Sequence, residues 1–375
     1  MYAPGRPPAT AFARLRLAAR PAGLRADGAL GEAVRVNPRE LGEFGLIEAI
    51  RRRAARDRRG ASGWHVAIGD DAAAFVPKRG EELVATTDAL VEDVHFRWRT
   101  TDPRSLGHKA LAVNLSDVGA MGARPVGFLL TLGFPPRIAA ARLDGFFRGL
   151  LKLARASRCP LVGGDIVRSP AFTATVTAFG AVPAGRLLLR RGARAGERLM
   201  LTGALGGAAA GLRLLEGPGA RTPAERALVR RQIAPDPPWR AGARLVQARL
   251  SRAAIDVSDG LAQDLGHLAR ASGVGARVEL ESLPLAPGLA RAAARLRVDP
   301  LALALSGGED YELLFTVGRR GPSAAALSRR LLCRVTEIGA ITAARGVVFT
   351  RGGRPFEPHD TGFQHFKAPR RRSEK

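Results

Sequence analysis

Cysteine is almost absent from this chain of 375 residues, which contains only Cys159 and Cys333. Neither lies in a Cys-x-x-Cys pattern, and no Cys/His group has the spacing of a zinc site. The sequence therefore indicates neither a disulfide framework nor a structural zinc site. Free cysteines of this kind fit a reducing, cytoplasmic environment.

Long hydrophobic runs are also missing. The longest apolar stretches, such as residues 127–134, are far shorter than the roughly 18 residues needed to cross a bilayer. We therefore expect no membrane span.

Aromatic residues make up only 5% of the chain, and lysine occurs only at positions 78, 109, 152, 367 and 375. The formal net charge of +25 therefore comes from arginine, which is dispersed along the chain. Nucleic-acid-binding proteins cluster their basic residues and usually add aromatic residues on which bases stack. The composition thus argues against a nucleic-acid partner and is typical of a biased source genome.

Short apolar segments alternate with helical ones from about Leu41 onward, which predicts an α/β fold. The length indicates about two domains, with a boundary near residues 183–192. Residues 1–38 are expected to be a disordered extension or to result from a start codon placed too far upstream. The alternative is an organelle-targeting segment. The predicted division is an extension at 1–38, an N-terminal domain at 39–185, a C-terminal domain at 186–366 and a basic tail at 367–375.

Individual elements follow from the apolar pattern and the turn residues. The predicted helices include residues 105–121, 138–157 and 208–215. We also expect a strand directly before Ser306. The other predicted strands include residues 82–87, 126–132, 173–182, 198–202, 254–257 and 311–317.

Carboxylates flanked by Gly, Ser or Thr recur where these strands are expected to end. They lie at Asp71, Asp88, Asp165, Asp256 and Asp259, with Asp117 in a similar helical motif. If several such strand ends met in one cleft, their carboxylates would repel each other unless a cation bound there. Mg²⁺ prefers oxygen ligands and often uses carboxylates together with substrate phosphates. Because Thr86, Thr87 and Ser258 add neutral oxygens, the set predicts a multi-metal phosphate site.

Simpler roles exist for parts of this pattern. Asp117 and Asp259 could each cap a helix. The glycine-rich segment 202–207 could bind phosphate or could only form a tight, closely packed turn. Glu309 could contact a ligand or belong to a structural turn. No P-loop lysine motif and no Gly-x-Ser-x-Gly motif occurs in the sequence.

Taken in order, the motifs resemble those of the thiamine-phosphate kinase family, from about Leu41 to Phe366. Order and spacing agree together, which makes the resemblance specific. The matching segments are Gly42-Glu43-Phe44, Ile68 to Ala73, Thr87 to Phe96 with Glu92-Asp93-Val94-His95, Lys109 to Asp117, Gly163-Gly164-Asp165, Asp256 to Leu261 and Ser306 to Glu312.

This resemblance implies the two-domain fold of the aminoimidazole ribonucleotide synthetase-like superfamily. The N-terminal domain would form a β-barrel across a homodimer, and the C-terminal domain would be α/β. The implied activity is ATP-dependent phosphorylation of thiamine monophosphate to thiamine diphosphate, the last step of its biosynthesis. It would proceed by direct in-line transfer with several Mg²⁺ ions.

The resemblance also implies roles for individual residues. Asp88, Asp117 and Asp256 would be catalytic. Gly164, Asp165, Arg190 and Ser258 would contact ATP, and His95, Glu309 and Phe363 would contact the substrate. The implied magnesium ligands are Asp71, Thr86, Thr87, Asp88, Asp117, Asp165, Asp256 and Asp259.

Two positions depart from the family pattern. Gln232 stands where the family often has His, and Phe363 replaces a more usual Tyr or Trp. The rivals within the same fold are aminoimidazole ribonucleotide synthetase and selenophosphate synthetase, but no cysteine precedes Cys159 as the latter usually requires. A nucleic-acid-binding or scaffolding protein that keeps the fold without activity is the rival from another class, which the intact carboxylate set disfavours.

Overall fold

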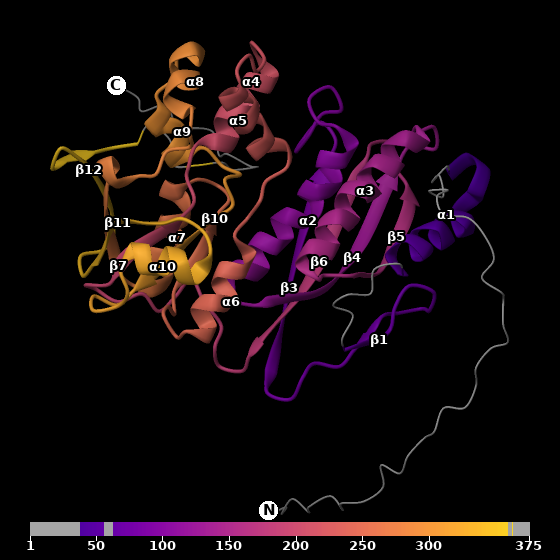
Figure 1. Cartoon of the computed structure of the whole chain (residues 1–375), viewed down its shortest axis with the longest axis horizontal. Helices are drawn as coiled ribbons and strands as arrows, with labels where there is room; N and C mark the ends of the chain where they lie inside the picture. Colours follow the sequence, from indigo (N-terminus) through magenta and orange to yellow (C-terminus); the bar gives the residue numbers. More distant parts are fainter. Residues whose placement is uncertain (1–37, 56–62, 359–361, 363–375) are drawn as a thin grey trace, which may run out of the picture. The chain divides into compact units, whose positions relative to one another are not determined.

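The computed structural model of the protein describes residues 38–55, 63–358 and 362 (Figure 1). The expected basic tail at 367–375 and the expected extension, apart from Pro38, lie outside the described residues. The structure is mixed α/β and contains two main sheets. Within its described part, no helix is both long and apolar enough to cross a membrane.

Helices and strands alternate along most of the chain. The helices are α1 (Pro38–Ala55), α2 (Pro103–Ala120), α3 (Ala140–Ser157), α4 (Gly207–Glu216), α5 (Pro223–Ile233), α6 (Trp239–Gln247), α7 (Leu261–Ser272), α8 (Leu289–Leu296), α9 (Pro300–Ser306) and α10 (Ala324–Leu331). The strands are β1 (Trp64–Val66), β2 (Ala74–Phe75), β3 (Glu81–Val91), β4 (Arg124–Phe134), β5 (Leu161–Arg168), β6 (Thr173–Pro183), β7 (Arg198–Thr202), β8 (Ala254–Val257), β9 (Gly275–Glu279), β10 (Glu312–Val317), β11 (Val335–Thr342), β12 (Gly346–Arg351) and β13 (Arg354–Phe356).

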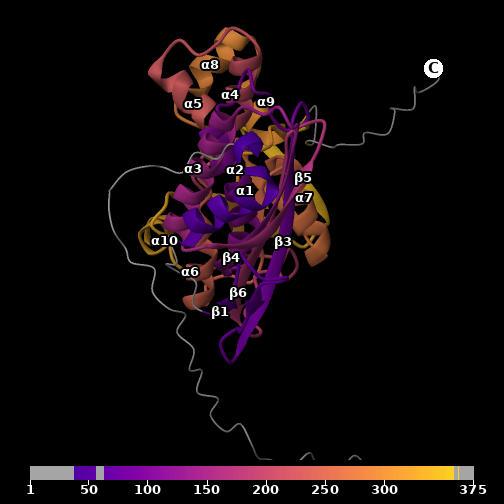
Figure 2. The ribbon, with the colours of Figure 1, turned by 90° about the vertical axis from the view of Figure 1, so that its right-hand side faces the viewer.

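The first main sheet has the strand order β3-β6-β4-β5. The pairs β3–β6 and β6–β4 are antiparallel, and β4–β5 is parallel. Side chains alternate between the two faces of β3, so Val84 and Leu90 are buried. Helix α2 packs against β3, and α3 packs against α2 (Figure 2). The opposite side of β3 is exposed, and we call this side of the sheet the open face. On β3 it carries Leu83, Ala85, Thr87 and Ala89.

Helix α2 is the central helix of this half of the molecule. The Asp102 carboxylate caps its N-terminus by accepting from the N–H groups of Arg104 and Ser105, both at 3.0 Å. Two glycines let α2 and α3 approach closely. A Cβ at Gly107 would lie 1.9 Å from the Phe146 carbonyl oxygen, and one at Gly149 would lie 1.8 Å from that of Arg104. The packing therefore leaves no room for a side chain at either position.

The second main sheet has the strand order β13-β12-β9-β11-β7-β10-β8. All neighbours are antiparallel except β12 and β9. Strand β8 forms one edge, and α2 packs against both β8 and β10. Strand β8 is thus placed beside α2, the central helix of the first half.

Two expectations from the sequence need correction. Asp88 and Asp165 lie inside β3 and β5 rather than at strand ends, because both ladders continue past the carboxylate. The residues before Ser306 form α9 rather than a strand. The cause is local, since the Asp299 carboxylate caps this helix by accepting from Leu301 N–H and Pro300 occupies its first turn.

Candidate active site

The described part of the chain contains a pocket with a volume of about 1110 Å³, which we call the main pocket. Its lining comes from both halves of the described chain and includes the end of β3, α2, the turn between β8 and α7 and the segment between α9 and β10. Seven of the residues predicted for the site line it: Asp88, His95, Asp117, Asp256, Ser258, Asp259 and Glu309. Residues up to 221 positions apart in the sequence, Asp88 and Glu309, are thereby brought into one cavity.

Asp88 and Asp117 form the acidic centre of this pocket. Burial raises the pKa of Asp88, and the charge of Asp117 and a hydrogen bond with it raise that pKa further. Burial also raises the pKa of Asp117, although the Thr86 hydroxyl and the charge of Arg190 oppose this. Thr86 Oγ1 donates to Asp117 Oδ2 at 2.6 Å. The pair is therefore costly to ionise completely without a cation.

Asp256 in β8 adds a third carboxylate. It is 5% exposed, and Ser116 Oγ donates to its Oδ2 at 2.7 Å. Burial raises the pKa of Asp256, and the charge of Asp117 adds to the effect. The acidic centre thus joins a strand of the first sheet, a helix and a strand of the second sheet.

Asp259 lies at the turn between β8 and α7. It does not cap α7, because the N-cap residue of that helix is Gly260, which has no side chain to accept a hydrogen bond. Instead, Asp264 accepts from the N–H groups of Asp259 and Gly260 at 3.0 and 3.1 Å. Burial raises the pKa of Asp264 to about 7, and the charge of Asp259 contributes. The capping interpretation also fails for Asp117, which lies in the last turn of α2.

His95 and Glu309 line the same pocket at different points. The Nδ1 atom of His95 accepts from the Val91 N–H at 3.1 Å, so in the neutral ring the proton is on Nε2. Glu309 has a positive φ of 68°, and its N–H donates to the Ser258 carbonyl at 2.7 Å. Both segments are therefore held by the backbone as well as by their side chains.

The other predicted residues that the structure describes do not line the pocket. Thr86 adjoins it through Asp117, and Arg190 is within electrostatic reach of that carboxylate. Thr87 and Asp165 lie on the open face of the sheet, as the strand register shows, whereas Asp88 is on the covered face. Phe363 lies outside the described residues. Asp71 is exposed in the loop before β2, and Gly164 lies in β5.

Gly164 has a structural requirement of its own. Its φ is 152°, and a Cβ there would lie 1.9 Å from the Leu130 carbonyl oxygen of the neighbouring strand. Close approach of β4 and β5 is thus enough to require glycine at this position.

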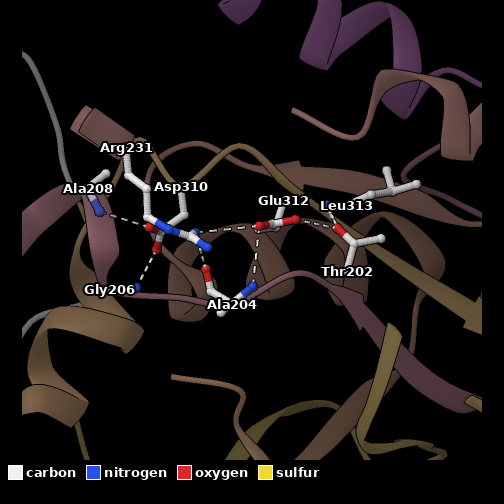
Figure 3. A network of polar contacts seen from close by, with 8 residues as sticks. All are labelled: Thr202, Ala204, Gly206, Ala208, Arg231, Asp310, Glu312 and Leu313. Carbon is white, nitrogen blue, oxygen red and sulfur yellow. Dashed lines mark hydrogen bonds and ion pairs between the residues drawn. The ribbon is translucent and has the colours of Figure 1, made fainter. Parts of the chain in front are cut away.

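The glycine-rich segment 202–207 is held by two buried carboxylates (Figure 3). Asp310 accepts from the N–H groups of Gly206 and Ala208 at 2.6 and 3.1 Å. Glu312 accepts from Thr202 Oγ1 at 2.7 Å and from Ala204 N–H at 3.3 Å. These donors are therefore already used within the protein, which favours the tight, packed turn over the phosphate-binding interpretation.

The acidic residues of the pocket suit one mode of magnesium binding. Among the described residues, no three His, Cys, Asp or Glu side chains converge in the arrangement of a metal site. Mg²⁺, however, is commonly held by one or two carboxylates together with substrate phosphates. The crowded pair Asp88 and Asp117, with Asp256 nearby, fits this mode of binding because a cation would relieve its repulsion.

Comparison with known proteins decides the family. The models for the AIR synthase related protein N-terminal and C-terminal domains match residues 69–182 and 194–351. Thiamine-monophosphate kinase of Escherichia coli (strain K12) is 40% identical over 340 residues, which span 88% of this chain and 99% of that protein. The chain belongs to the thiamine-monophosphate kinase family. The expectation drawn from the motifs is thus confirmed.

Other members of the thiamine-monophosphate kinase family agree. The Mycobacterium tuberculosis (strain ATCC 25618 / H37Rv) protein is 40% identical over 278 residues, 73% of this chain and 80% of its own. The crystal structure of thiamine-monophosphate kinase from Stenotrophomonas maltophilia K279a has a TM-score of 0.74 and 38% identity, covering 84% of this chain and 98% of that one.

Two further structures bear on ligands and on the fold. AaThiL complexed with AMPPCP and TMP has a TM-score of 0.67 and 34% identity over 88% of this chain and 98% of that one. The hydrogenase maturation protein HypE of E. coli, at 19% identity and a TM-score of 0.67, shares the fold.

Lys109, Gln232 and Tyr311 are among the pocket residues that received no role from the sequence. Lys109 and Tyr311 lie within the motifs that carried the resemblance, and the scarcity of lysine could have drawn attention to Lys109. Burial and the neighbouring charge of Glu309 raise the pKa of Tyr311 well above its usual value, so its hydroxyl stays protonated. Gln232 is separated from the other two by at least 79 residues, and only folding brings it to them.

Proposed function

We propose that this protein transfers the γ-phosphoryl group of ATP to the phosphate of thiamine monophosphate, giving thiamine diphosphate and ADP. This would be the last step of thiamine diphosphate biosynthesis. One observation carries the proposal: in a chain of this family, Asp88, Asp117 and Asp256 meet His95 and Glu309 in one pocket. Support also comes from the similar AaThiL, which was solved with AMPPCP, an ATP analogue, and TMP.

The chemistry suits such a pocket. The acceptor is a phosphate that is already anionic near neutral pH, so it needs no strong general base. A phosphate oxygen of thiamine monophosphate forms a bond to the γ-phosphorus while the bond from that phosphorus to the bridging oxygen of ADP breaks. The transfer is direct and in line, without a phosphorylated enzyme.

The acidic residues would hold magnesium. Asp88, Asp117, Asp256 and Asp259 would provide carboxylate ligands, and Thr86 would orient Asp117 through its hydroxyl. When bound, magnesium supplies positive charge that offsets the repulsion between two polyanionic substrates. The pocket residues would hold the phosphate of thiamine monophosphate and the γ-phosphate of ATP close together and in the right orientation. Asp71, Thr87 and Asp165 remain proposed ligands from the sequence.

The other roles are proposed on the same basis. Gly164, Asp165, Arg190 and Ser258 would bind ATP. His95, Glu309 and Phe363 would bind thiamine monophosphate. Of these, Ser258, His95 and Glu309 have pocket positions that support the assignment.

A homodimer is part of the proposal. The open face of the first sheet carries exposed apolar groups, including Leu83 at 50% and Val167 at 44%. A second copy on this face would bury these groups and could close a barrel between the two sheets. It would also cover the face that carries Thr87 and Asp165. The division into domains at 39–185 and 186–366, a cytoplasmic location and the absence of a nucleic-acid partner belong to the same proposal.

The test is direct. Purified protein is incubated with ATP, Mg²⁺ and thiamine monophosphate, and thiamine diphosphate is followed by chromatography, with Asp88→Ala as the control. Product that needs magnesium and disappears in the variant supports both the reaction and the site. A well-folded dimer that binds Mg-ATP but makes no product rejects the assignment and favours a related ATP-using synthetase.

A further inference from the structure

Lys109 is a buried lysine inside the main pocket. It is 2% exposed, whereas Lys78 and Lys152 are exposed. Its Nζ lies 2.6 Å from Glu309 Oε1 and donates to the Gln232 carbonyl oxygen at 3.1 Å. Lys109 is on α2, about two turns before Asp117, and both residues line the pocket. A lysine in this position needs its partners, because an unpaired buried charge is very costly.

Glu309 is held at both carboxylate oxygens. Lys109 pairs with Oε1, and the Gln232 side-chain amide donates to Oε2. The Glu309 N–H is bound to Ser258 as described above. Helices α2 and α5 therefore hold the side chain of Glu309, and the β8–α7 turn holds its backbone. Such a side chain has a fixed direction, while 29% of its surface remains exposed.

The chemistry of the fixed carboxylate limits what it can bind. An ionised carboxylate only accepts hydrogen bonds, and two of its acceptor sites are already used. A phosphate group brings negative charge and no suitable donor, so Glu309 must face another part of the substrate. Thiamine carries one obvious N–H donor, the amino group on its pyrimidine ring.

We propose that Lys109 and Gln232 are positioning residues that fix Glu309, so that its carboxylate accepts a hydrogen bond from the pyrimidine amino group of the substrate. This inference rests on the proposed function. It names the contacts by which the enzyme selects the organic part of thiamine monophosphate. Lys109 acts through Glu309 rather than on a phosphate, since its ammonium group is buried and already has two partners.

A double-mutant cycle tests whether Lys109 acts through Glu309. Lys109→Met is expected to raise KM for thiamine monophosphate roughly 10-fold or more, as loss of a hydrogen bond to a charged group does. KM for ATP should change less than about 2-fold. In the Glu309→Gln background, Lys109→Met should add little, because coupled residues are not additive. Lys109→Arg should restore part of the lost affinity. Lys152→Met, the same change on the exposed side of α3, should leave KM unchanged.

A substrate analogue tests which group of the substrate donates a hydrogen bond to Glu309. In oxythiamine monophosphate an oxygen replaces the pyrimidine amino group, so the donor is lost. We expect the wild-type enzyme to prefer thiamine monophosphate by roughly 10-fold or more. In Glu309→Gln and Lys109→Met, this preference should shrink to about 2-fold. Gln232→Ala provides a second variant that removes the other contact to Glu309 without burying a lone charge.

The outcomes separate the two proposals. If the wild-type enzyme does not phosphorylate thiamine monophosphate, both the proposed function and this inference fail. If it does, and Lys109→Met and Glu309→Gln are additive, or KM for ATP rises instead, only the inference fails and Lys109 contacts phosphate directly. An unchanged preference for the natural substrate in folded variants also rejects it. Thermal unfolding of each variant shows that it is folded.

Discussion

Ser116 Oγ donates a 2.7 Å hydrogen bond to Oδ2 of Asp256. The bond joins the central helix of the first half to the edge strand of the second, since Ser116 lies in α2 and Asp256 in β8. Both side chains are buried, at 4% and 5% exposure. This contact therefore couples the folding of the two halves to the geometry of the acidic centre.

Replacing this serine should lower both the stability of the protein and its activity. Ser116→Ala removes a donor from a buried carboxylate, which costs about 1–3 kcal/mol and leaves Asp256 less well oriented. We expect kcat/KM to fall roughly 10-fold or more. The matched control is Ser157→Ala on α3, a buried serine that bonds only to backbone carbonyls of its own helix. Steady-state kinetics and thermal unfolding of both variants check the prediction, and an equal loss of activity in the control would contradict it.

Removing a carboxylate from the acidic centre should lower activity without lowering the stability of the metal-free protein. Asp88→Asn relieves the repulsion by Asp117 that raises the pKa of Asp88, so the metal-free variant should be at least as stable as the wild type. Wild-type protein should gain thermal stability on addition of MgCl₂, and the variant should gain less. Activity should fall at least about 100-fold.

Scanning calorimetry with and without magnesium gives the first two quantities. Glu337→Gln, which removes a surface partner of Arg198, is the control that should keep the magnesium effect. A clear loss of metal-free stability in Asp88→Asn would show that Asp88 is structural rather than functional.

The carboxyl group of Asp310 should give the stability of the protein a pH dependence. Burial, helped by Glu312, raises its pKa from 3.8 to about 7. The folded state thus holds this proton more tightly than the unfolded chain does. Its stabilising contribution is present below about pH 4 and is lost as the pH rises to about 7, by up to about 1.4 kcal/mol per pH unit.

Asp310→Asn should therefore lose stability less steeply than the wild type between pH 5 and 7. Urea unfolding at a series of pH values measures both slopes. Asp102→Asn is the contrasting control, because its N-cap hydrogen bonds lower the pKa of Asp102 and its contribution changes only at lower pH. Parallel curves for the wild type and Asp310→Asn would disprove the prediction.

Gly164 should be required for folding, whatever its contact with ATP. An alanine Cβ would meet the Leu130 carbonyl oxygen at 1.9 Å, so Gly164→Ala should destabilise the protein by about 2 kcal/mol or more. Gly318→Ala is the control, since its Cβ would have no neighbour within 4 Å. Chemical unfolding measures both. Full stability of Gly164→Ala with weakened ATP binding would favour a direct ligand contact instead.

Local sequence signals predicted much of the secondary structure. The strands at 198–202 and 254–257 have the predicted bounds, because short apolar segments there are bordered by turn residues. The residues before Ser306 were assigned wrongly. Their apolar run is short enough to fit a strand or a helix, and the Asp299 cap decides for the helix.

The sequence by itself determined the family, the alternating α/β character and the chemical types gathered in the pocket, because these depend on residue order and spacing. It could not determine which carboxylates meet. Asp88 and Thr87 are neighbours in the chain, yet strand alternation sends them to opposite faces of the sheet. Only the tertiary structure joined Glu309 to Lys109 and Gln232, since contacts between residues so far apart in the sequence come from the packing of helices and sheets and not from local sequence.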